Sequence, residues 1–183
     1  MHVEELNIGG LKLISPRLFQ DARGFFLESY QQPRYAASGI ACPFVQTNHS
    51  RSLRGTLRGL HYQQGQAKLI TVIRGRIFDV VVDLRPESQT FGRWEAATLD
   101  DEKHQQLFVP EGLAHGFCVV SDVADVVYQT TSVYDPRLEG AIRYDDHELA
   151  IPWPITPPTL SARDLGAESF AAFRARLNPQ GGA

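Results

Sequence analysis

The sequence has few cysteines, no long apolar run and no large excess of charge, and each shortage excludes a class of protein. Cys42 and Cys118 are too few for a disulfide framework and lack the C-x-x-C spacing of a metal site, so they indicate a reducing compartment. No apolar run approaches the roughly 20 residues that span a bilayer. The N-terminus, with Glu4 and Glu5, lacks the basic start of a signal peptide. We therefore expect a cytoplasmic protein with no membrane partner.

The charge and composition are those of an ordinary globular protein. A formal net charge of −3 and a pI near 6.1 argue against nucleic acid as a partner, because a phosphate backbone favours a basic surface. With 43% hydrophobic and 21% charged residues, a chain of 183 residues can build its own core. We expect a single domain over residues 1–183, with a frayed tail from about residue 178.

Hydrophobic residues recur with a period of two along most of the chain, which predicts an all-β fold. The expected strands are 11–15, 24–30, 56–63, 68–73, 76–85, 93–99, 105–109, 115–120 and 123–134. In the stretch 76–85, one face should carry Phe78, Val80, Val82 and Leu84, and the other Ile77, Asp79, Val81 and Asp83. Only two helices are expected, at 33–38 and at 166–177. Many short strands in succession are typical of a sandwich or barrel.

The segment 48–63 concentrates three arginines and two histidines in a β-patterned stretch. Its arginines are Arg51, Arg54 and Arg58. Their planar guanidinium groups suit phosphate or carboxylate, and His61 changes its charge near neutral pH, so the segment favours acid–base chemistry on an anionic substrate. One alternative is an arginine-rich edge strand that discourages aggregation. In another, Arg51 and Arg54 pair with acidic residues such as Asp79 and Asp83.

A second group lies at 110–117, where the pattern P-x-G-x-x-H is similar to the second half of the cupin signature. In cupins this histidine, here His115, helps to bind a metal inside a double-sheet jelly roll. The first half of the signature, H-x-H followed by glutamate, is missing, because no histidine or glutamate follows His61 until Glu87. Two histidines fall short of the usual set of about three or four metal ligands, so we expect no metal. They suit proton transfer or the binding of substrate oxygen better.

Longer motifs extend over most of the chain, in order. They are D-A-R-G-F-F-L-E-S at 21–29, Q-T-N-H-S-R-S-L-R-G-T-L-R-G-L-H-Y-Q at 46–63, Q-A-K-L at 66–69, the hairpin residues 73–80, V-P-E-G-L-A-H-G-F at 109–117 and L-S-A-R-D at 160–164. With them the sequence resembles the nucleotide-sugar 3,5-epimerases, typified by dTDP-4-dehydrorhamnose 3,5-epimerase. The resemblance implies a cupin-like double-sheet jelly roll with a short C-terminal helix, usually a homodimer, that uses neither metal nor organic cofactor. The implied reaction converts dTDP-4-dehydro-6-deoxyglucose to dTDP-4-dehydrorhamnose, a step of dTDP-rhamnose and cell-surface polysaccharide biosynthesis.

Inverting a carbon beside a ketone needs a base on one face of the sugar ring and an acid on the other. It also needs a donor or cation at the oxygen where enolate charge develops. The resemblance implies that His61 is the base and that Asp164 fixes its tautomer and stabilises its charged form. Lys68 would stabilise the enolate, and Tyr128 would return a proton to the opposite face. His115 would support the keto and hydroxyl groups.

The resemblance also implies a set of substrate-binding residues. Arg23 and Arg58 would bind the diphosphate, to which bidentate guanidinium groups are suited. The other expected residues are Phe26, Glu28, Gln46 and Asn48 near the nucleoside, and Tyr134. Residues 23–28 would come from the neighbouring subunit. Val133 stands where relatives often carry a second aromatic residue, so the base preference is open.

The catalytic residues have simpler explanations. Asp164 could be a first-turn helix acid, since Ser161 to Asp164 is an N-cap signal. Lys68 could be a solvated lysine at the start of a strand, and Tyr128 a core tyrosine.

Strand alternation raises a further difficulty, because it puts Arg58 and His61 on opposite faces of their strand. Gly59 could host a bulge that re-aims the strand. Alternatively, Arg58 could serve a phosphate placed elsewhere.

Other functions stay open from the sequence. A metal-dependent cupin, either a dioxygenase or an isomerase, would need an ion. A noncatalytic sugar-nucleotide binding module would keep the arginines. Within the epimerase class, a 3-only or 5-only epimerase or a 3,4-ketoisomerase could act on a dTDP, CDP or GDP sugar.

Overall fold

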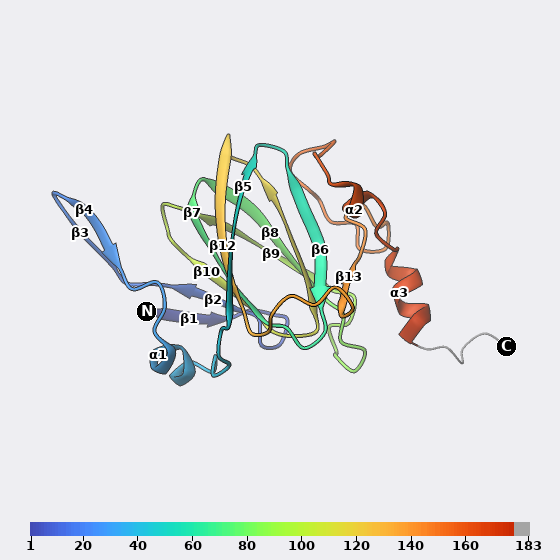
Figure 1. The fold of residues 1–183 in the computed structure, drawn as a ribbon, viewed down its shortest axis with the longest axis horizontal. Coiled ribbons are helices and arrows are strands. Elements are labelled where there is room, and N and C mark those ends of the chain that lie inside the picture. Colours follow the sequence, from blue (N-terminus) through green and yellow to red (C-terminus); the bar gives the residue numbers. More distant parts are fainter. Residues whose placement is uncertain (178–183) are drawn as a thin grey trace.

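The computed structural model describes residues 1–177 as two antiparallel sheets that face each other, with a projecting hairpin and short helices around them (Figure 1). The first sheet has the strand order β1 (His2–Glu5), β2 (Lys12–Ser15), β10 (Gln106–Val109), β7 (Lys68–Arg74), β12 (Val123–Thr130) and β5 (Gln46–Leu53). The second sheet has the order β13 (Glu139–Ala141), β6 (Leu57–Gln63), β11 (Leu113–Val119), β8 (Arg76–Asp83) and β9 (Trp94–Asp100). The predicted double-sheet jelly roll is confirmed. The predicted frayed tail lies outside the described residues.

The main core lies between the two sheets, and the second sheet is buried on both faces. On β8, Ile77 and Val81 point into the core between the sheets, while Val80 and Val82 belong to a second cluster on the far side. That second cluster includes Phe170 and Phe173 of α3 (Phe170–Leu177), the red helix in Figure 1. The two faces predicted for the stretch 76–85 are therefore confirmed, as is the short C-terminal helix.

The outer face of the first sheet is partly covered by the segment around α1 (Gln32–Ala37). Tyr35 and Ile40 are almost fully buried there, against Ile14 and Phe108 of the sheet. The Tyr35 hydroxyl bonds to the side chain of Gln106, so this contact is both apolar and polar.

A hairpin of β3 (Leu18–Asp21) and β4 (Gly24–Leu27) belongs to neither sheet and projects from the body of the protein, in blue at the left of Figure 1. The Asp21 carboxylate accepts a hydrogen bond of 2.8 Å from the Arg23 amide and closes the turn. Gly24 follows with φ of 122°, a conformation that residues with a Cβ rarely adopt.

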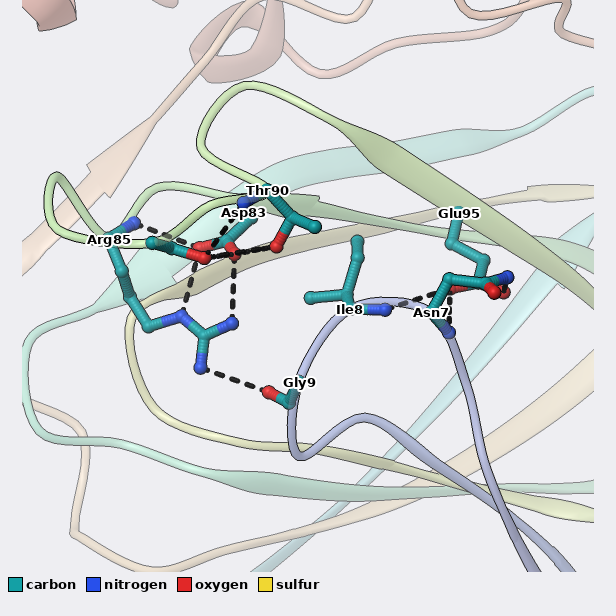
Figure 2. Close-up of polar contacts among 8 residues, drawn as sticks. Asn7, Ile8, Gly9, Asp83, Arg85, Thr90 and Glu95 are labelled. Carbon is teal, nitrogen blue, oxygen red and sulfur yellow. Dashed lines mark hydrogen bonds and ion pairs between the residues drawn. The ribbon is translucent and has the colours of Figure 1, made fainter.

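Polar contacts tie the loop between β1 and β2 to the second sheet (Figure 2). Glu95 accepts hydrogen bonds from the Asn7 amide at 3.0 Å and from Asn7 Nδ2 at 2.9 Å. Arg85 Nη1 donates to the Gly9 carbonyl at 3.0 Å, while its Nε and Nη2 bind Asp83. Burial raises the pKa of Asp83, but hydrogen bonds from Arg85 and two hydroxyl groups outweigh it and lower this pKa to about 2. The end of the β1–β2 hairpin is thus fixed to the opposite sheet.

The predicted boundaries differ from the structure in three ways. The strands β1, β3 and β13 were not expected, and β5 was expected only as part of the β-patterned stretch 48–63, because these four strands are mostly polar or exposed and show little hydrophobic alternation. The strand predicted at 123–134 ends at Thr130, where the Thr130 hydroxyl donates to the Ser132 carbonyl as the chain turns away. The helix predicted at 166–177 starts only at Phe170 and is preceded by the separate α2 (Ala162–Leu165), which ends at Gly166. Among residues 1–177 no helix is long and apolar enough to cross a membrane.

Candidate active site

A cavity of about 500 Å³ lies between the two sheets. The first sheet contributes residues of β5, β7 and β12, the second sheet contributes residues of β6, β11 and β13, and α2 adds Asp164. The predicted residues that line it are Gln46, Asn48, Arg58, His61, Lys68, His115, Tyr128, Tyr134 and Asp164. Only Arg23, Phe26 and Glu28 lie elsewhere, on and next to the projecting hairpin.

His61 and Asp164 form a hydrogen-bonded pair at one side of the cavity, with Nε2 and Oδ1 2.5 Å apart. Asp164 is buried in the first turn of α2, where Ser161 is the N-cap and its hydroxyl donates to Asp164 Oδ2 at 2.6 Å. Burial acts to raise the pKa of Asp164, but the hydrogen bonds from His61 and Ser161 outweigh it and hold this pKa below its ordinary value. The N-cap is as predicted, yet Asp164 does more than stabilise a helix end, because its carboxylate also binds the imidazole.

His115 forms a second pair with a carboxylate, which the sequence reasoning missed. Its Nε2 lies 2.8 Å from Oδ2 of Asp79 on β8, and Asp79 is completely buried. Burial raises the pKa of Asp79, and the nearby His115 and Lys68 oppose this shift. The signal in the sequence was an aspartate between the apolar Ile77 and Val81 on the inward face of β8. Because His115 and His61 are partners in the β11–β6 register, both pairs reach the same cavity.

Lys68 begins β7 and points into the cavity from the first sheet, where its Nζ donates to the His61 carbonyl at 3.2 Å. Burial lowers its pKa to about 8, although the negative charges of Glu139 and Asp79 act in the opposite direction. The explanation as a solvated lysine is therefore wrong. An ammonium group with this pKa is mostly charged at pH 7 and can release its proton slightly above it.

Tyr128 lies on β12, on the same wall as Lys68 and on the wall opposite His61. Its ring packs against the main core, while the residue also lines the cavity. Burial raises the pKa of its hydroxyl, which keeps the phenol protonated at neutral pH. Tyr128 is thus anchored in the core and can also act as a proton donor to a bound molecule.

Arg58 and His61 reach the same cavity because the β6–β11 pairing is irregular. The register shifts between His115 and Phe117, opposite the stretch that contains Gly59, so the expected bulge is confirmed. Gly59 has φ of 133°, and a Cβ at this position would come within 2.4 Å of Gly116.

One hydrogen bond orients the exposed side chain of Arg58 at the cavity. Arg58 Nε donates to the Ser52 hydroxyl of β5 at 2.9 Å and thus connects the two sheets. Its remaining guanidinium nitrogens have no bond to a described residue and are available to an anion.

The cavity mouth holds residues that were not predicted as part of the site, among them Glu139, which lies outside the motifs, and Arg163, which lies within L-S-A-R-D. Glu139 binds Arg163 at 2.7 Å and also bonds to the Tyr134 hydroxyl, which raises the pKa of Tyr134. Since Arg163 precedes Asp164 in α2, this ion pair joins the mouth to the His61–Asp164 pair. The other unassigned lining residues are Ser50, Tyr62, Gln63, Gln66, Phe117, Thr130 and Ser161.

The remaining arginines of the segment 48–63 do not enter the cavity. Arg51 binds Asp125 through Nε at 2.9 Å and Nη2 at 3.0 Å, and Arg54 donates to the Val120 carbonyl. Arg51 therefore does pair with an acidic residue, but the partner is Asp125. The pairs named with Asp79 and Asp83 are wrong, because strand register brings those aspartates to His115 and Arg85.

The three predicted residues near the hairpin make only local contacts. Arg23 is bound to Asp21 at 2.6 Å with its side chain 89% exposed, and Phe26 is 69% exposed. Glu28 binds Arg34 at 3.3 Å. None of the three lines the cavity of this chain, and the hairpin that carries Arg23 and Phe26 projects away from the body of the protein (Figure 1).

The side chains that line the cavity also indicate whether it could bind a metal ion. Both histidines direct Nε2 at a carboxylate rather than at a shared point. Among residues 1–177 there is no group of three or more His, Cys, Asp or Glu side chains placed to hold a metal ion. The donor set therefore does not fit a metal centre of the usual kind.

Comparisons with a family model and with individual proteins indicate the same family. The family model described as dTDP-4-dehydrorhamnose 3,5-epimerase matches residues 5–172. The dTDP-4-dehydrorhamnose 3,5-epimerase of Pseudomonas aeruginosa is 47% identical over 175 residues, which cover 93% of this chain and 97% of that protein. The dTDP-4-dehydrorhamnose 3-epimerase of Streptomyces niveus is 43% identical over 178 residues, covering 95% and 86%. The chain spans 53% of a 44% identical relative from Neisseria gonorrhoeae.

Solved structures agree with this result. The Legionella pneumophila dTDP-6-deoxy-D-glucose-3,5-epimerase in complex with dTDP-4-keto-L-rhamnose superposes with a TM-score of 0.92 at 45% identity, covering 100% of this chain and 99% of that one. The Bacillus anthracis dTDP-4-dehydrorhamnose 3,5-epimerase with TDP and PPi bound gives a TM-score of 0.90 at 44% identity, covering 92% and 98%. The two sheets described above are thus the cupin-like fold that the sequence motifs implied. By its motifs, its fold and these relatives, the chain belongs to the dTDP-4-dehydrorhamnose 3,5-epimerase family.

Proposed function

We propose that this chain converts dTDP-4-dehydro-6-deoxyglucose into dTDP-4-dehydrorhamnose by inverting C3 and C5 of the sugar. The observation that carries the proposal is the arrangement of acid–base groups on opposite walls of one cavity. His61 with Asp164 stands on the side of the second sheet, and Lys68 and Tyr128 stand on the first. Inversion requires this arrangement, because one proton leaves one face of the ring and another arrives at the opposite face. The bound nucleotide sugar of the Legionella relative supports the substrate class.

The first step is removal of the proton from the carbon beside the 4-keto group. His61 takes this proton on the ring nitrogen that does not face Asp164, and the C–H bonding electrons move into an enolate. The low pKa of Asp164 keeps it ionised, so it stabilises the imidazolium that forms. The hydrogen bond from the Ser161 hydroxyl holds the carboxylate in place during the step.

The enolate oxygen needs a positive charge or a donor close by. Lys68 supplies an ammonium group from the opposite wall, and His115, held by Asp79, supplies a second polar group. Because both are fixed before substrate arrives, little reorganisation is needed as charge develops on the oxygen.

The second step returns a proton to the other face of the same carbon. The Tyr128 hydroxyl gives its proton to the enolate carbon and becomes a phenolate, and the ketone re-forms with inverted configuration. The raised pKa of Tyr128 agrees with a group that holds its proton until the enolate is present. The imidazolium then loses a proton to water and the phenolate gains one, so the cycle balances without a redox change.

Substrate binding uses the remainder of the cavity. Arg58 suits the diphosphate, since its free guanidinium nitrogens line the cavity. Gln46 and Asn48 are hydrogen-bonded to each other at 2.9 Å on β5 and suit the nucleoside, as does the half-exposed ring of Tyr134.

We also propose that two chains form a homodimer in which the hairpin of each reaches the partner's cavity. The exposed Arg23 and Phe26, together with Glu28, would then complete the neighbouring site. Their absence from the cavity of their own chain supports this arrangement.

Since Cys42 and Cys118 are both free thiols, a cytoplasmic location fits the chain.

The decisive experiment is incubation of the enzyme with dTDP-4-dehydro-6-deoxyglucose in deuterated water, with NMR to locate the deuterium. Label at C3 and C5 with both centres inverted is the expected result. Label missing from one of the two carbons would overturn the proposed double inversion, and label missing from both would favour the noncatalytic alternative.

A second candidate is a 3-epimerase, which the similarity to the Streptomyces niveus 3-epimerase favours. Both reactions use the same base, enolate and acid, and they differ in whether the ring turns so that C5 also faces His61. Deuterium confined to C3, with C5 unchanged, would select this candidate.

A further inference from the structure

Three glutamine side chains converge on the short segment 132–135, which crosses the mouth of the cavity after β12 and carries Tyr134. They come from different parts of the fold, since Gln46 begins β5, Gln63 ends β6 and Gln66 precedes β7. All three also line the cavity.

Gln63 uses its whole amide group on this segment. Its Nε2 donates to the Val133 carbonyl and to the Ser132 hydroxyl, each at 3.0 Å, and its Oε1 accepts from the Asp135 amide at 2.9 Å. The residue as a whole is only 5% exposed. The amide therefore grips the backbone on both sides of Tyr134 and has no donor left for substrate.

The other two glutamines act on the same stretch. Gln66 Nε2 donates to the Ser132 carbonyl at 3.1 Å and to its hydroxyl at 3.2 Å. Gln46 Oε1 accepts from the Tyr134 amide at 3.0 Å, while its Nε2 holds Asn48. The backbone of Tyr134 is therefore fixed from three directions, although its ring is half exposed.

Gln63 also fixes the position of the segment 132–135 relative to His61, the proposed base. His61 and Gln63 are two residues apart on β6 and both line the cavity, so a short, rigid piece of strand links the imidazole to the residue that holds Tyr134. The separation between the base and the Tyr134 ring is thereby set by β6 and by the three hydrogen bonds of Gln63.

We propose that Gln63, assisted by Gln66, is a positioning residue that holds Tyr134 at the distance from His61 that a nucleotide sugar spans. The inference rests on the proposed function, because it assumes that the Tyr134 ring contacts the nucleotide. The purely structural alternative is that Gln63 satisfies a buried turn and has no bearing on affinity.

The test compares Gln63→Met, which keeps the side-chain length but removes all three hydrogen bonds, with Gln105→Met. Gln105 is a matched control, because its Nε2 also donates to a serine hydroxyl at 3.0 Å, that of Ser15, and it does not line the cavity. The dTDP affinity is measured by calorimetry below the unfolding temperature of every variant, and KM and kcat are measured with the nucleotide sugar.

We expect Gln63→Met to weaken dTDP and to raise KM by about tenfold, the equivalent of losing a hydrogen bond or two at the site. The value of kcat should fall less than about threefold, because His61, Lys68 and Tyr128 are untouched. Gln105→Met should match the wild type in both. Gln66→Met, which loses only the contacts to Ser132, should give a smaller change of the same kind, and it replaces Gln63→Met if that variant does not fold.

A double-mutant cycle with Tyr134→Ala then separates positioning from general damage. If Gln63 acts through Tyr134, Gln63→Met should change dTDP affinity less than about twofold in the Tyr134→Ala background. Independent, multiplying effects would overturn the inference, as would wild-type affinity in Gln63→Met or equal losses in Gln105→Met.

The proposed function can fail separately. A wild type that binds no dTDP would overturn the function itself. Hydrogen exchange at the Tyr134 and Asp135 amides still decides whether Gln63 holds the segment. Faster exchange is expected in Gln63→Met than in the wild type or Gln105→Met, and unchanged exchange would contradict it.

Discussion

Replacing Lys68 with methionine should stabilise the protein while removing most of its activity. Lys68 is an ammonium group held in the cavity, where burial lowers its pKa from the usual 10.5 to about 8. Methionine has a similar length and no charge. The same substitution therefore removes the group proposed to stabilise the enolate, for which a loss of about 10²–10³ in kcat is expected.

The size of the stability effect follows from the pKa. The difference between 10.5 and about 8 corresponds to about 3 kcal/mol of unfavourable free energy for the charged lysine in the folded state. Against this, the variant loses the hydrogen bond to the His61 carbonyl, which is worth about 1 kcal/mol. The variant should thus be about 1–2 kcal/mol more stable than the wild type at pH 7.

The sign of the pH dependence is also determined. Because the folded state binds this proton less tightly than the unfolded state, the penalty is complete below pH 8 and fades as the pH rises towards 10.5. Between pH 7 and pH 9 it should shrink by about 1.3 kcal/mol, so the advantage of the variant over the wild type should shrink equally.

Urea unfolding of both proteins at pH 7, 8 and 9, at one protein concentration, measures these differences. Lys103→Met is the control, because Lys103 is exposed in a loop and should leave the stability close to that of the wild type. A stability difference that does not vary between pH 7 and pH 9, or a Lys68→Met variant less stable than the wild type at pH 7, would refute the reasoning.

Three further predictions concern the chemistry. Exhaustive chelation with EDTA should leave turnover unchanged, since the cavity has no set of metal ligands among residues 1–177, and activity lost to EDTA and restored by one divalent ion would contradict this. His61→Ala should reduce turnover by about 10²–10⁴-fold or more, and Asp164→Asn by less, because the imidazole would remain with weaker orientation; near-wild-type deuterium exchange at both carbons in His61→Ala would mean that another base acts. Tyr128→Phe should still let solvent deuterium enter with retained configuration, by return from the His61 side, while inverted product falls sharply. Equal loss of exchange and inversion, or intact inversion, would remove Tyr128 as the acid.

Local patterns in the sequence were sufficient for the architecture and the family. Side chains of a strand alternate between faces, so the period of two in the stretch 76–85 predicted both buried faces of β8 correctly. The motifs around His61, His115 and Asp164 are short contiguous runs, which is why a single sequence was enough to recognise the family that the relatives confirm. The strand β5 was not listed as a separate strand because every residue in it except Leu53 is polar, which leaves no hydrophobic alternation.

Only the tertiary structure decided which polar groups meet. Asp79 lies 36 residues from His115, and Gln63 lies 70 residues from Val133, yet each pair is hydrogen-bonded in or beside the cavity. Such contacts depend on strand order, on register and on the bulge at Gly59, which are properties of two paired strands and of neither strand alone. For that reason the sequence by itself determined which chemical groups this protein has and which fold carries them. The packing of two sheets, whose strands lie far apart in the sequence, decided that base and acid face each other across one cavity.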